Sequence, residues 1–535
     1  MNILFIMVDQ LRYDYLGCTG HASIKTPHID ALAAQGVNFS QCYVQAPLCG
    51  PSRMSTYTGR YCHSHGATWN GIPLRVGEMT MGDHLRSLDM DTILCGKTHA
   101  VPDVAGMQRL GIDPDSTTGK RIAECGFDVW ERMDGEFPAG LPDLTSTYQD
   151  YLRDKGYQSD NPWHDFANSG EDEDGNLLSG WKLSSSTQPA RIAKEDSETA
   201  WLTTRAMNFL SQTNETPWCL HLSYIKPHWP YVAPAPYHNM YSQADIQPAV
   251  RSNSELANPH PVLATFQQKR VGKTFSRPEV REAVIPAYMG LISEIDDQIG
   301  RLMSHLDSLG LRDNTMIIFT SDHGDYLGDH WLGEKELFHD ASARVPLIVV
   351  DPGGDADATR GSVCNELVEA IDLAPTFVDY AGGTPQRHLL QGHSLRPLLQ
   401  GKSGSLRQYV ISEYDYCLKS ARNTLDQPIS DCRLAMIYDG RYKLMHAEGF
   451  RPMLFDLHND PDEMNDLGNS PEHADTSNRL MDQLNAWYRQ HHNKTNLSEA
   501  EVIKRENGDL KRGILLGFWD QAELDDAYRI GRSGN

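Results

Sequence analysis

The chain has 535 residues, 39% of them hydrophobic and 22% charged, which predicts a large globular protein with one main core and a smaller companion. These proportions exclude collagen-like, coiled-coil and wholly disordered chains. The formal net charge of −24 argues against nucleic acid or an anionic membrane as the main partner, although a pocket inside an acidic shell can be locally cationic.

The chain start and the cysteines indicate a reducing compartment. The first apolar run, residues 3–8, is too short to span a bilayer, and no basic leader precedes it, so we expect neither a membrane anchor nor a secretory signal. The ten cysteines have no regular spacing and form no Cys-x-x-Cys pair, which argues against a disulfide framework and a structural zinc site. We therefore expect a cytoplasmic protein.

Short apolar runs alternate with amphipathic stretches over residues 1–395, which is typical of an α/β domain with a large, mostly parallel sheet sandwiched by helices. Helices are predicted from Pro27, with Thr26 as the N-cap, to Gly36, and through 202–210 and 288–306. Buried strands are predicted at residues 2–8, 92–95, 218–224, 316–320 and 346–350.

Residues 101–195 differ from the rest of this domain because they are polar, weakly periodic and rich in Asp, Gly, Ser and Pro. They predict a polar surface excursion of the kind that forms a lid or rim. Its acidic run at 171–175 lacks the closing glutamate of a calcium loop and is interpreted as a solvated turn.

After residue 395 the pattern changes to short strands. Strands are predicted at 409–412, 434–438 and 442–446, with a tight hairpin at Asp439-Gly440 and a helix over 476–489. Residues 396–492 are therefore predicted to form a smaller subdomain, an antiparallel sheet plus a helix. The tail, 493–535, carries an apolar cluster that favours contact between subunits in a dimer or tetramer: Leu515, Leu516, Phe518 and Trp519.

Two polar pairs directly follow predicted strands: Asp9-Gln10 and Asp322-His323. Parallel strands end at one edge of a sheet, where open α/β folds place their sites. Either pair alone is better explained as a helix cap or turn, but two pairs at equivalent edges favour one divalent metal. Calcium prefers oxygen ligands, whereas manganese accepts the imidazole as well, so both Mn²⁺ and Ca²⁺ stay open.

A second candidate segment, residues 47–60, contains Cys49 at the predicted start of a helix, because Pro51 suits the first turn and Gly59 suits the end. The free N–H groups there favour an anion. Arg53 lies four residues later on the same helix face, which suits a tetrahedral oxyanion substrate. The alternative is an ordinary buried cysteine, which this spacing outweighs only modestly.

These residues carry a resemblance to a known family. Cys49-Gly50-Pro51-Ser52-Arg53 followed by Thr58-Gly59-Arg60 matches the signature Cys-x-Pro-Ser-Arg-x-x-x-x-Thr-Gly-Arg. The chain thus resembles the formylglycine-dependent sulfatases of the alkaline phosphatase superfamily and their relatives, the phosphonate monoester hydrolases. The resemblance extends to the first strand, the Asp322-His323 edge and residues 454–463, and implies an alkaline phosphatase-like fold.

The resemblance implies the chemistry of residue 49. A formylglycine-generating enzyme would oxidise Cys49 to formylglycine, whose hydrate attacks a small anionic ester and then releases the anion. Asp9, Gln10, Asp322 and His323 would join the modified Cys49 around the metal.

The resemblance also implies a cationic pocket around the ester. The side chains of this pocket with catalytic roles would be Arg53, Lys97, His99, His228 and Lys335. Lys97 and Lys335 would also bind the ester oxygens, and Asn70 matches a substrate-contacting position. Singly, each lysine or histidine is better explained as a solvated side chain.

Different residues of the sequence indicate different esters, sulfate or phosphonate, as the substrate. Gln10, His323 and the segment 226–241 resemble the phosphonate monoester hydrolase branch, whereas Lys97 and His99 are the sulfatase choices, where the phosphonate branch has Tyr and Thr. We therefore predict an arylsulfatase-type sulfate monoester hydrolase with promiscuous phosphonate monoester and phosphodiester hydrolysis. Phosphonate or phosphodiester hydrolysis as the main activity is one alternative. The other is a non-catalytic, metal-dependent anion-binding protein with an unmodified Cys49.

Overall fold

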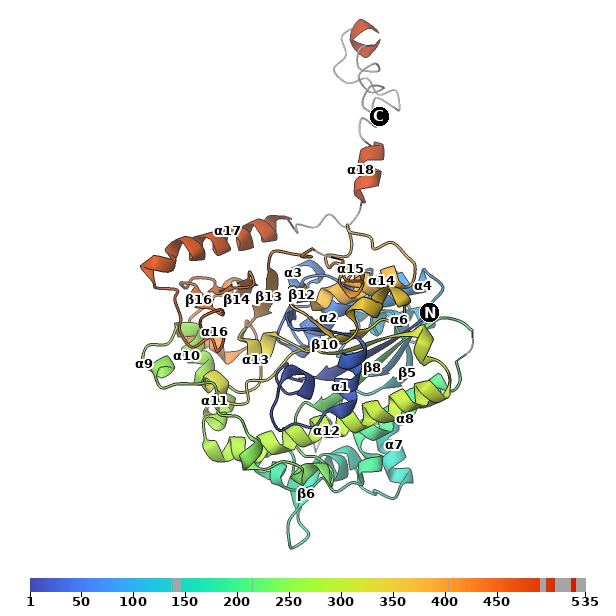
Figure 1. Ribbon diagram of the computed structural model, residues 1–535, viewed down its shortest axis with the longest axis vertical. Coiled ribbons are helices and arrows are strands. Elements are labelled where there is room, and N and C mark those ends of the chain that lie inside the picture. The colour runs from blue at the N-terminus through green and yellow to red at the C-terminus, as the bar shows by residue number, and fades with distance from the viewer. Residues whose placement is uncertain are drawn as a thin grey trace. The chain divides into compact units, whose positions relative to one another are not determined.

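An eight-stranded sheet lies at the centre of the protein, with the order β11-β2-β10-β9-β1-β8-β4-β5 (Figure 1). β1 is parallel to both β8 and β9, and β4 is parallel to β8 and β5, while β10 is antiparallel to β2 and β9. The predicted large, mostly parallel sheet is confirmed. Its strands are β1 (Asn2–Asp9), β2 (Val37–Phe39), β4 (Asp91–Gly96), β5 (Asp128–Arg132), β8 (Trp218–Pro227), β9 (Thr315–Ser321), β10 (Leu347–Val350) and β11 (Ser362–Cys364).

The structure is a computed structural model that describes residues 1–135, 137, 146–213, 215–402, 404–490, 497–505 and 521–525. One compact unit comprises Met1–Pro385 and Leu390–His492, and a second, small unit comprises Gln386–Leu389 and Asn493–Asn535. The second unit contains α18 (Glu499–Arg505). The apolar tail cluster at 515–519 lies outside the described residues, so the oligomer contact stays a prediction.

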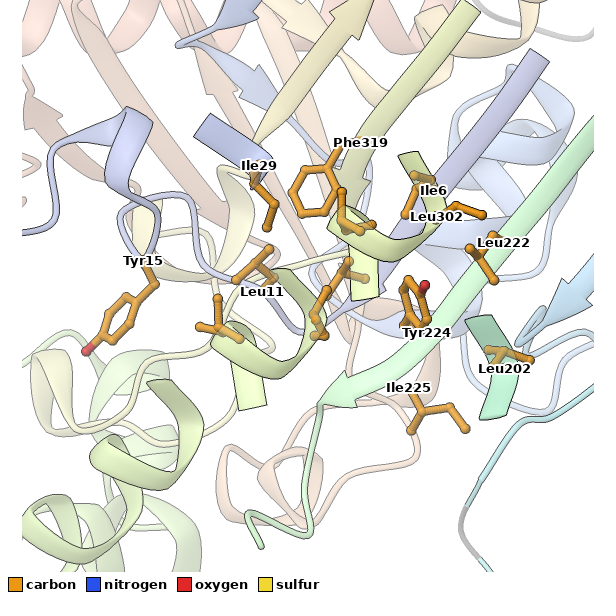
Figure 2. Close-up of a cluster of buried hydrophobic side chains, with 14 of the residues drawn as sticks. Ile6, Leu11, Tyr15, Ile29, Leu202, Leu222, Tyr224, Ile225, Leu302 and Phe319 are labelled. Carbon is orange, nitrogen blue, oxygen red and sulfur yellow. The ribbon is translucent and has the colours of Figure 1, made fainter. Parts of the chain in front are cut away.

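Helices cover both faces of the central sheet, so its central strands are buried on both faces. The even-numbered residues of β1, among them Leu4 and Ile6, join a core with one set of helices, and the odd-numbered Ile3 and Phe5 join a core with another. Figure 2 shows the first core, in which Ile6 and Phe319 of the sheet lie among side chains from three helices. Those helices are α1 (Pro27–Gln35), α8 (Glu198–Leu210) and α12 (Pro278–Ser308); the opposite face carries α2 (Cys49–Thr58), α4 (Met81–Arg86) and α14 (Leu373–Tyr380).

The three predicted helices are present, but α1 is capped differently from the prediction. Thr26 is the N-cap residue, yet its side chain donates to Asp30 instead of capping the helix. Asp296 of α12 accepts the free N–H groups of His28 and Ile29, at 3.0 and 2.8 Å. A tertiary contact therefore supplies the cap, and no local sequence signal could reveal it.

The region 101–195 is only partly the predicted surface excursion. β5 joins the central sheet as its edge strand, parallel to β4. Its Asp-Val-Trp-Glu-Arg sequence looks like a surface segment because an edge strand leaves side chains such as Val129 exposed. The acidic turn is confirmed between β6 and β7. The other elements here are α5 (Val104–Leu110), α6 (Thr117–Ala123), α7 (Thr147–Asp154), β6 (Ser169–Glu171) and β7 (Leu177–Ser179).

A separate four-stranded antiparallel sheet follows residue 395, as predicted, in the order β13-β14-β15-β16. Its strands are β13 (Val410–Asp415), β14 (Arg433–Tyr438), β15 (Tyr442–Ala447) and β16 (Met453–Asp456). The amphipathic α17 (Ala474–Gln490) buries Leu480, Leu484 and Trp487 against it. The hairpin at Asp439-Gly440 is confirmed, whereas β16 was not predicted.

Short elements complete the described chain. They are β3 (Cys42–Tyr43), β12 (Val368–Glu369), α3 (Cys62–His65), α9 (Ser254–Ala257), α10 (Pro261–Gln267), α11 (Arg270–Phe275), α13 (Asp340–Ala343), α15 (Arg396–Leu399) and α16 (Ser420–Thr424). All ten cysteines are free thiols. Among the described residues, the helices lack the combination of length and apolar character that crossing a bilayer requires.

The cap of α1 by Asp296 can be tested by stability. Asp296→Ala removes the acceptor of two helix N–H groups and should lower the free energy of unfolding by about 1 kcal/mol, the usual cost of a lost N-cap. Urea denaturation measures the change. Asp296→Asn keeps one acceptor oxygen and should lose less; an equal loss in both variants would contradict a capping role.

Candidate active site and metal centre

The predicted site residues meet at the carboxyl edge of the central sheet. Asp9 is the last residue of β1, Asp322 directly follows β9, Lys97 follows β4 and His228 follows β8. Because these strands are parallel, their ends bring residues more than 300 positions apart in the sequence to one place. Cys49, at the first turn of α2, is part of the same buried group.

The start of α2 is closed by a side chain from beyond the helix. Asn70 Oδ1 accepts the Gly50 N–H at 2.8 Å, which satisfies one of the free donors of the first turn. A Cβ atom on Gly50 would lie 2.7 Å from that oxygen, so a larger residue there would require the Asn70 side chain to shift. Gly59 ends the helix with φ 64°, as predicted from its position. Asn70 is thereby fixed beside residue 49.

Four of the predicted metal ligands form one buried cluster. Ligand atoms of Asp9, Cys49, Asp322 and His323 all lie within 4.8 Å of one another. Cys49 Sγ is 3.0 Å from His323 Nε2 and 3.7 Å from Asp9 Oδ1. All four side chains are almost completely buried. Two carboxylates, an imidazole and residue 49 are donors suited to a divalent cation such as Mn²⁺ or Ca²⁺.

The orientation of His323 and Gln10 also fits a cation. His323 Nδ1 faces the Gly324 carbonyl at 2.9 Å, which leaves the Nε2 lone pair for the cluster, as metal-binding histidines usually do. Gln10 has φ 66° and donates its backbone N–H to Asp322 Oδ1 at 3.0 Å. Its Oε1 accepts from Lys335 Nζ at 3.0 Å, so an amide oxygen lies at the same edge.

Arg53 bonds both carboxylates of the cluster. Its Nε donates to Asp322 Oδ2 at 2.8 Å, and its Nη2 is 3.4 Å from Asp9 Oδ2. Nη1 donates to the Lys97 carbonyl and to Ser223 Oγ. Four N–H groups of this fully buried guanidinium are thus engaged by the protein. These contacts fix the guanidinium at the carboxylates, and the predicted catalytic role of Arg53 stays a prediction.

Cations surround Cys49 itself. Lys335 Nζ lies 3.2 Å from Sγ, Lys97 Nζ lies 2.7 Å from Asp9 Oδ2, and His228 hydrogen-bonds the Cys49 side chain. Burial alone would raise the pKa of the Cys49 thiol, but these cations and His323 lower it well below its usual value. Residue 49 therefore lies in a strongly electropositive environment, which favours an anion at this position.

Two side chains near the ends of β4 and β8, His99 and Lys226, are not directed at Cys49. Gly96 has φ 122° and His99 has φ 56°, so β4 has ended and alternation no longer sets the side of the chain on which His99 lies. The contacts of Cys49 among the described residues do not include His99. Lys226 is also directed elsewhere: its Nζ donates to Asn168 Oδ1 at 2.6 Å and to the Pro230 carbonyl at 2.9 Å.

Sequence reasoning missed a second layer of polar side chains. Tyr231 donates to Asp325 Oδ2 at 2.6 Å, and both bind the Gln10 amide nitrogen. Tyr288 donates to the Gln10 carbonyl at 2.7 Å. Tyr231 and Asp325 belong to the segments 226–241 and 320–325 that resemble the family, but neither spacing nor charge marked them as supports of Gln10.

A second group of potential ligands lies away from this edge, at His28, Asp296 and Asp297. His28 and Asp297 are exposed, and Asp296 already caps α1. Substitution of Asp297 in this group is a control for metal binding at the buried cluster.

Comparison with known proteins identifies the family of the chain. The sulfatase family model matches residues 1–120 and 126–383, and a model of the C-terminal region of N-sulphoglucosamine sulphohydrolase matches residues 328–490. The chain belongs to the sulfatase family. Its large sheet with flanking helices and its separate small antiparallel sheet are accordingly the alkaline phosphatase-like fold that the resemblance implied.

Relatives of this sulfatase-family chain include proteins that act on different esters. It is 32% identical over 521 residues to a multifunctional alkaline phosphatase superfamily protein of Trinickia caryophylli, covering 92% of this chain and 96% of the relative. It is 28% identical to an arylsulfatase of Clostridium perfringens, covering 89% and 91%. The phosphonate monoester hydrolase of Agrobacterium radiobacter has the same fold, with a TM-score of 0.79, 30% identity and coverage of 94% and 98%.

The metal site can be tested without measuring catalysis. After removal of divalent ions by chelation, adding Mn²⁺ or Ca²⁺ should raise the thermal unfolding midpoint, because a ligand at a hundred times its Kd adds about 2.7 kcal/mol of stability. His323→Gln should weaken this response, since it replaces one ligand of the buried cluster. Asp297→Asn is the matched control; loss of the response in that variant instead would assign the ion to the group at His28.

Proposed function

We propose that this sulfatase-family protein hydrolyses sulfate monoesters of the arylsulfatase type, with phosphonate monoesters and phosphodiesters as further substrates. The observation that carries the proposal is the arrangement at Cys49, where two lysines and a histidine surround residue 49 beside two buried carboxylates. Such a site attracts an anionic ester and holds it against a nucleophile at residue 49. Family membership supports both the modification of Cys49 to formylglycine and a bound divalent metal.

The proposed roles follow from the contacts of each side chain. When formed, the formylglycine hydrate supplies the attacking oxygen, and a bound dication supplies charge stabilisation. Asp9, Gln10, Asp322 and His323 would hold the cation, and Arg53 keeps Asp9 and Asp322 oriented. Lys97 and Lys335 would bind the ester oxygens, and Asn70 fixes the first turn of α2 beside them.

His228 is our candidate for proton transfer at the leaving oxygen. Its Nδ1 bonds the Trp229 carbonyl at 2.9 Å, so Nδ1 carries the hydrogen in that contact and Nε2 is available to the site. It also bonds the side chain of residue 49, which places it beside the ester. His99, two residues after Lys97, is a second candidate for the same task.

A second candidate function is phosphonate monoester or phosphodiester hydrolysis as the main activity. Gln10 and His323 in the cluster are the choices of that branch, and the phosphonate monoester hydrolase structure from Agrobacterium radiobacter superimposes well. We rank it second because Lys97 places a full positive charge 2.7 Å from Asp9, where the phosphonate branch has an uncharged tyrosine. A sulfate ester gains more from such a charge when its alcohol leaves.

We further propose the setting in which the protein works. A formylglycine-generating enzyme would mature Cys49, and the other nine cysteines, all of them free thiols, support the reducing cytoplasm as the location. The apolar tail supports a homo-oligomer, dimer or tetramer, with neither nucleic acid nor membrane as partner. The alternative from another class, an anion-binding protein without catalysis, requires Cys49 to stay a thiol.

Replacing Cys49 tests the nucleophile. Cys49→Ala should abolish hydrolysis of aryl sulfates while circular dichroism and the unfolding midpoint stay close to those of the wild type. Cys364→Ala, which removes a partly exposed thiol on β11, should keep full activity. Mass spectrometry of the wild-type peptide should find the aldehyde or its hydrate; an intact thiol would favour the anion-binding alternative.

Replacing Lys97 and His99 tests whether sulfate esters are preferred over phosphonate esters as substrates. Lys97→Tyr with His99→Thr should lower kcat/KM for an aryl sulfate by about a hundredfold, because a charged oxyanion contact is lost, and should affect the matched phosphonate ester less. Steady-state rates on paired aryl sulfate and aryl phosphonate substrates measure the ratio. An unchanged ratio would count against sulfate as the preferred ester.

A further inference from the structure

Lys335 reaches Cys49 from a backbone segment with unusual torsion angles. Its neighbours Glu334 and Glu336 have φ values of 61° and 100°, in the left-handed region that non-glycine residues avoid. Such backbone conformations are energetically unfavourable and persist only where surrounding contacts hold them. The position of the Lys335 ammonium, 3.2 Å from Cys49 Sγ, therefore depends on what holds its neighbours.

The carboxylate of Glu336 is held by two lysines from other parts of the chain. Lys419, just before α16, lies 2.5 Å from Glu336 Oε1, and Lys269, just before α11, pairs with Oε2. Glu336 is buried, which by itself would raise its pKa, but the two lysines lower the pKa below its usual value. Glu336 is therefore a buried anion that is paired with two cations.

Lys419 also contacts the opposite flank of the site. Its Nζ lies 5.0 Å from the centroid of the Trp69 ring, within the range of a cation–π contact. Trp69 directly precedes Asn70, whose Oδ1 accepts the Gly50 N–H at the start of α2. Trp69 also packs on Tyr414 of β13, with ring centroids 5.5 Å apart. One ammonium thus touches the neighbour of Lys335 and the neighbour of Asn70.

We infer that Lys419 is a positioning residue by which the C-terminal region completes the active site, holding Lys335 through Glu336 and Asn70 through Trp69. This inference rests on the proposed function for the roles of Lys335 and Asn70. Lys269 offers a matched comparison within the same chain. It pairs with the same carboxylate, but its cation–π contact is with the Phe266 ring, whose centroid lies 4.0 Å from Nζ.

Kinetics of three single variants test the inference. Lys419→Met should lower kcat for an aryl sulfate by about ten- to a hundredfold, with a smaller change in KM, because small displacements of catalytic groups act mainly on the transition state. Lys419→Arg should restore most of the rate, since arginine pairs with carboxylates and stacks on tryptophan. Lys269→Met should lose less than Lys419→Met; an equal loss would overturn the role of the Trp69 contact.

A double variant separates positioning from a direct role. If Lys419 acts in part through Lys335, the loss caused by Lys419→Met must be smaller in a Lys335→Ala background than in the wild type. Full additivity of the two losses would overturn the inference.

A chemical readout keeps the inference independent of activity. Acetylation by an N-hydroxysuccinimide ester, followed by mass spectrometry, should modify the buried Lys335 slowly in the wild type and faster in Lys419→Met, with the exposed Lys402 as internal reference. An unchanged rate at Lys335 would overturn the inference. If the wild type cleaves neither sulfate nor phosphonate esters, the proposed function fails, and the acetylation rates still decide whether Lys419 holds Lys335.

Discussion

Arg53 bonds the carboxylates of Asp9 and Asp322, which are buried side by side at the ends of β1 and β9. Two like charges removed from water at this spacing require compensation, and losing one partner of such a pair typically costs about 3–5 kcal/mol. The guanidinium comes from α2, the same helix that presents Cys49 at its first turn. The contact that neutralises the sheet edge therefore also fixes the reactive residue against it.

Two lysines add positive charge near the carboxylates that Arg53 binds. Lys97 pairs with Asp9, and Lys335 lies between Gln10 and Cys49. Under the proposed function, the oxygen atoms of the cluster would hold a cation and the ammonium groups of Lys97 and Lys335 would hold the anionic ester. Buried hydrogen bonds and ion pairs within the protein fix the positions of these charged groups.

The identity of the ester depends on few of these groups. Gln10 and His323 agree with the phosphonate monoester hydrolase branch, while Lys97 and His99 agree with the sulfatases. The relatives show the same range, from an arylsulfatase to a multifunctional member of the superfamily. In the structure Gln10, Lys97 and His323 lie next to the ends of the parallel strands β1, β4 and β9. Under the proposed function, substitutions at these strand ends would change the preferred ester without changing the fold.

The sequence predicted most of this arrangement because its signals are local. A buried strand followed by Asp9-Gln10 or by Asp322-His323, and a helix opened by Cys49 and Pro51, can each be recognised within about ten residues. Five of the eight central strands, the main helices and the hairpin at Asp439-Gly440 follow from the same kind of pattern. The strands β2, β5 and β11 were missed: β2 and β11 have only three residues each, and β5 leaves side chains such as Val129 exposed, so its composition is that of a surface segment.

What only the tertiary structure decided are contacts between distant segments. Asp296 caps α1 and Asn70 caps α2, each from outside the helix that it caps. Arg53 donates to the carboxylate of Asp322, and Lys226 donates to Asn168 and not to Cys49. Hydrophobic periodicity determines which face of a helix or strand is buried. The hydrogen-bond partner of a polar side chain depends instead on which charged and polar groups lie near it in the folded protein. Those partners are known only after the sheet has brought the ends of its strands together.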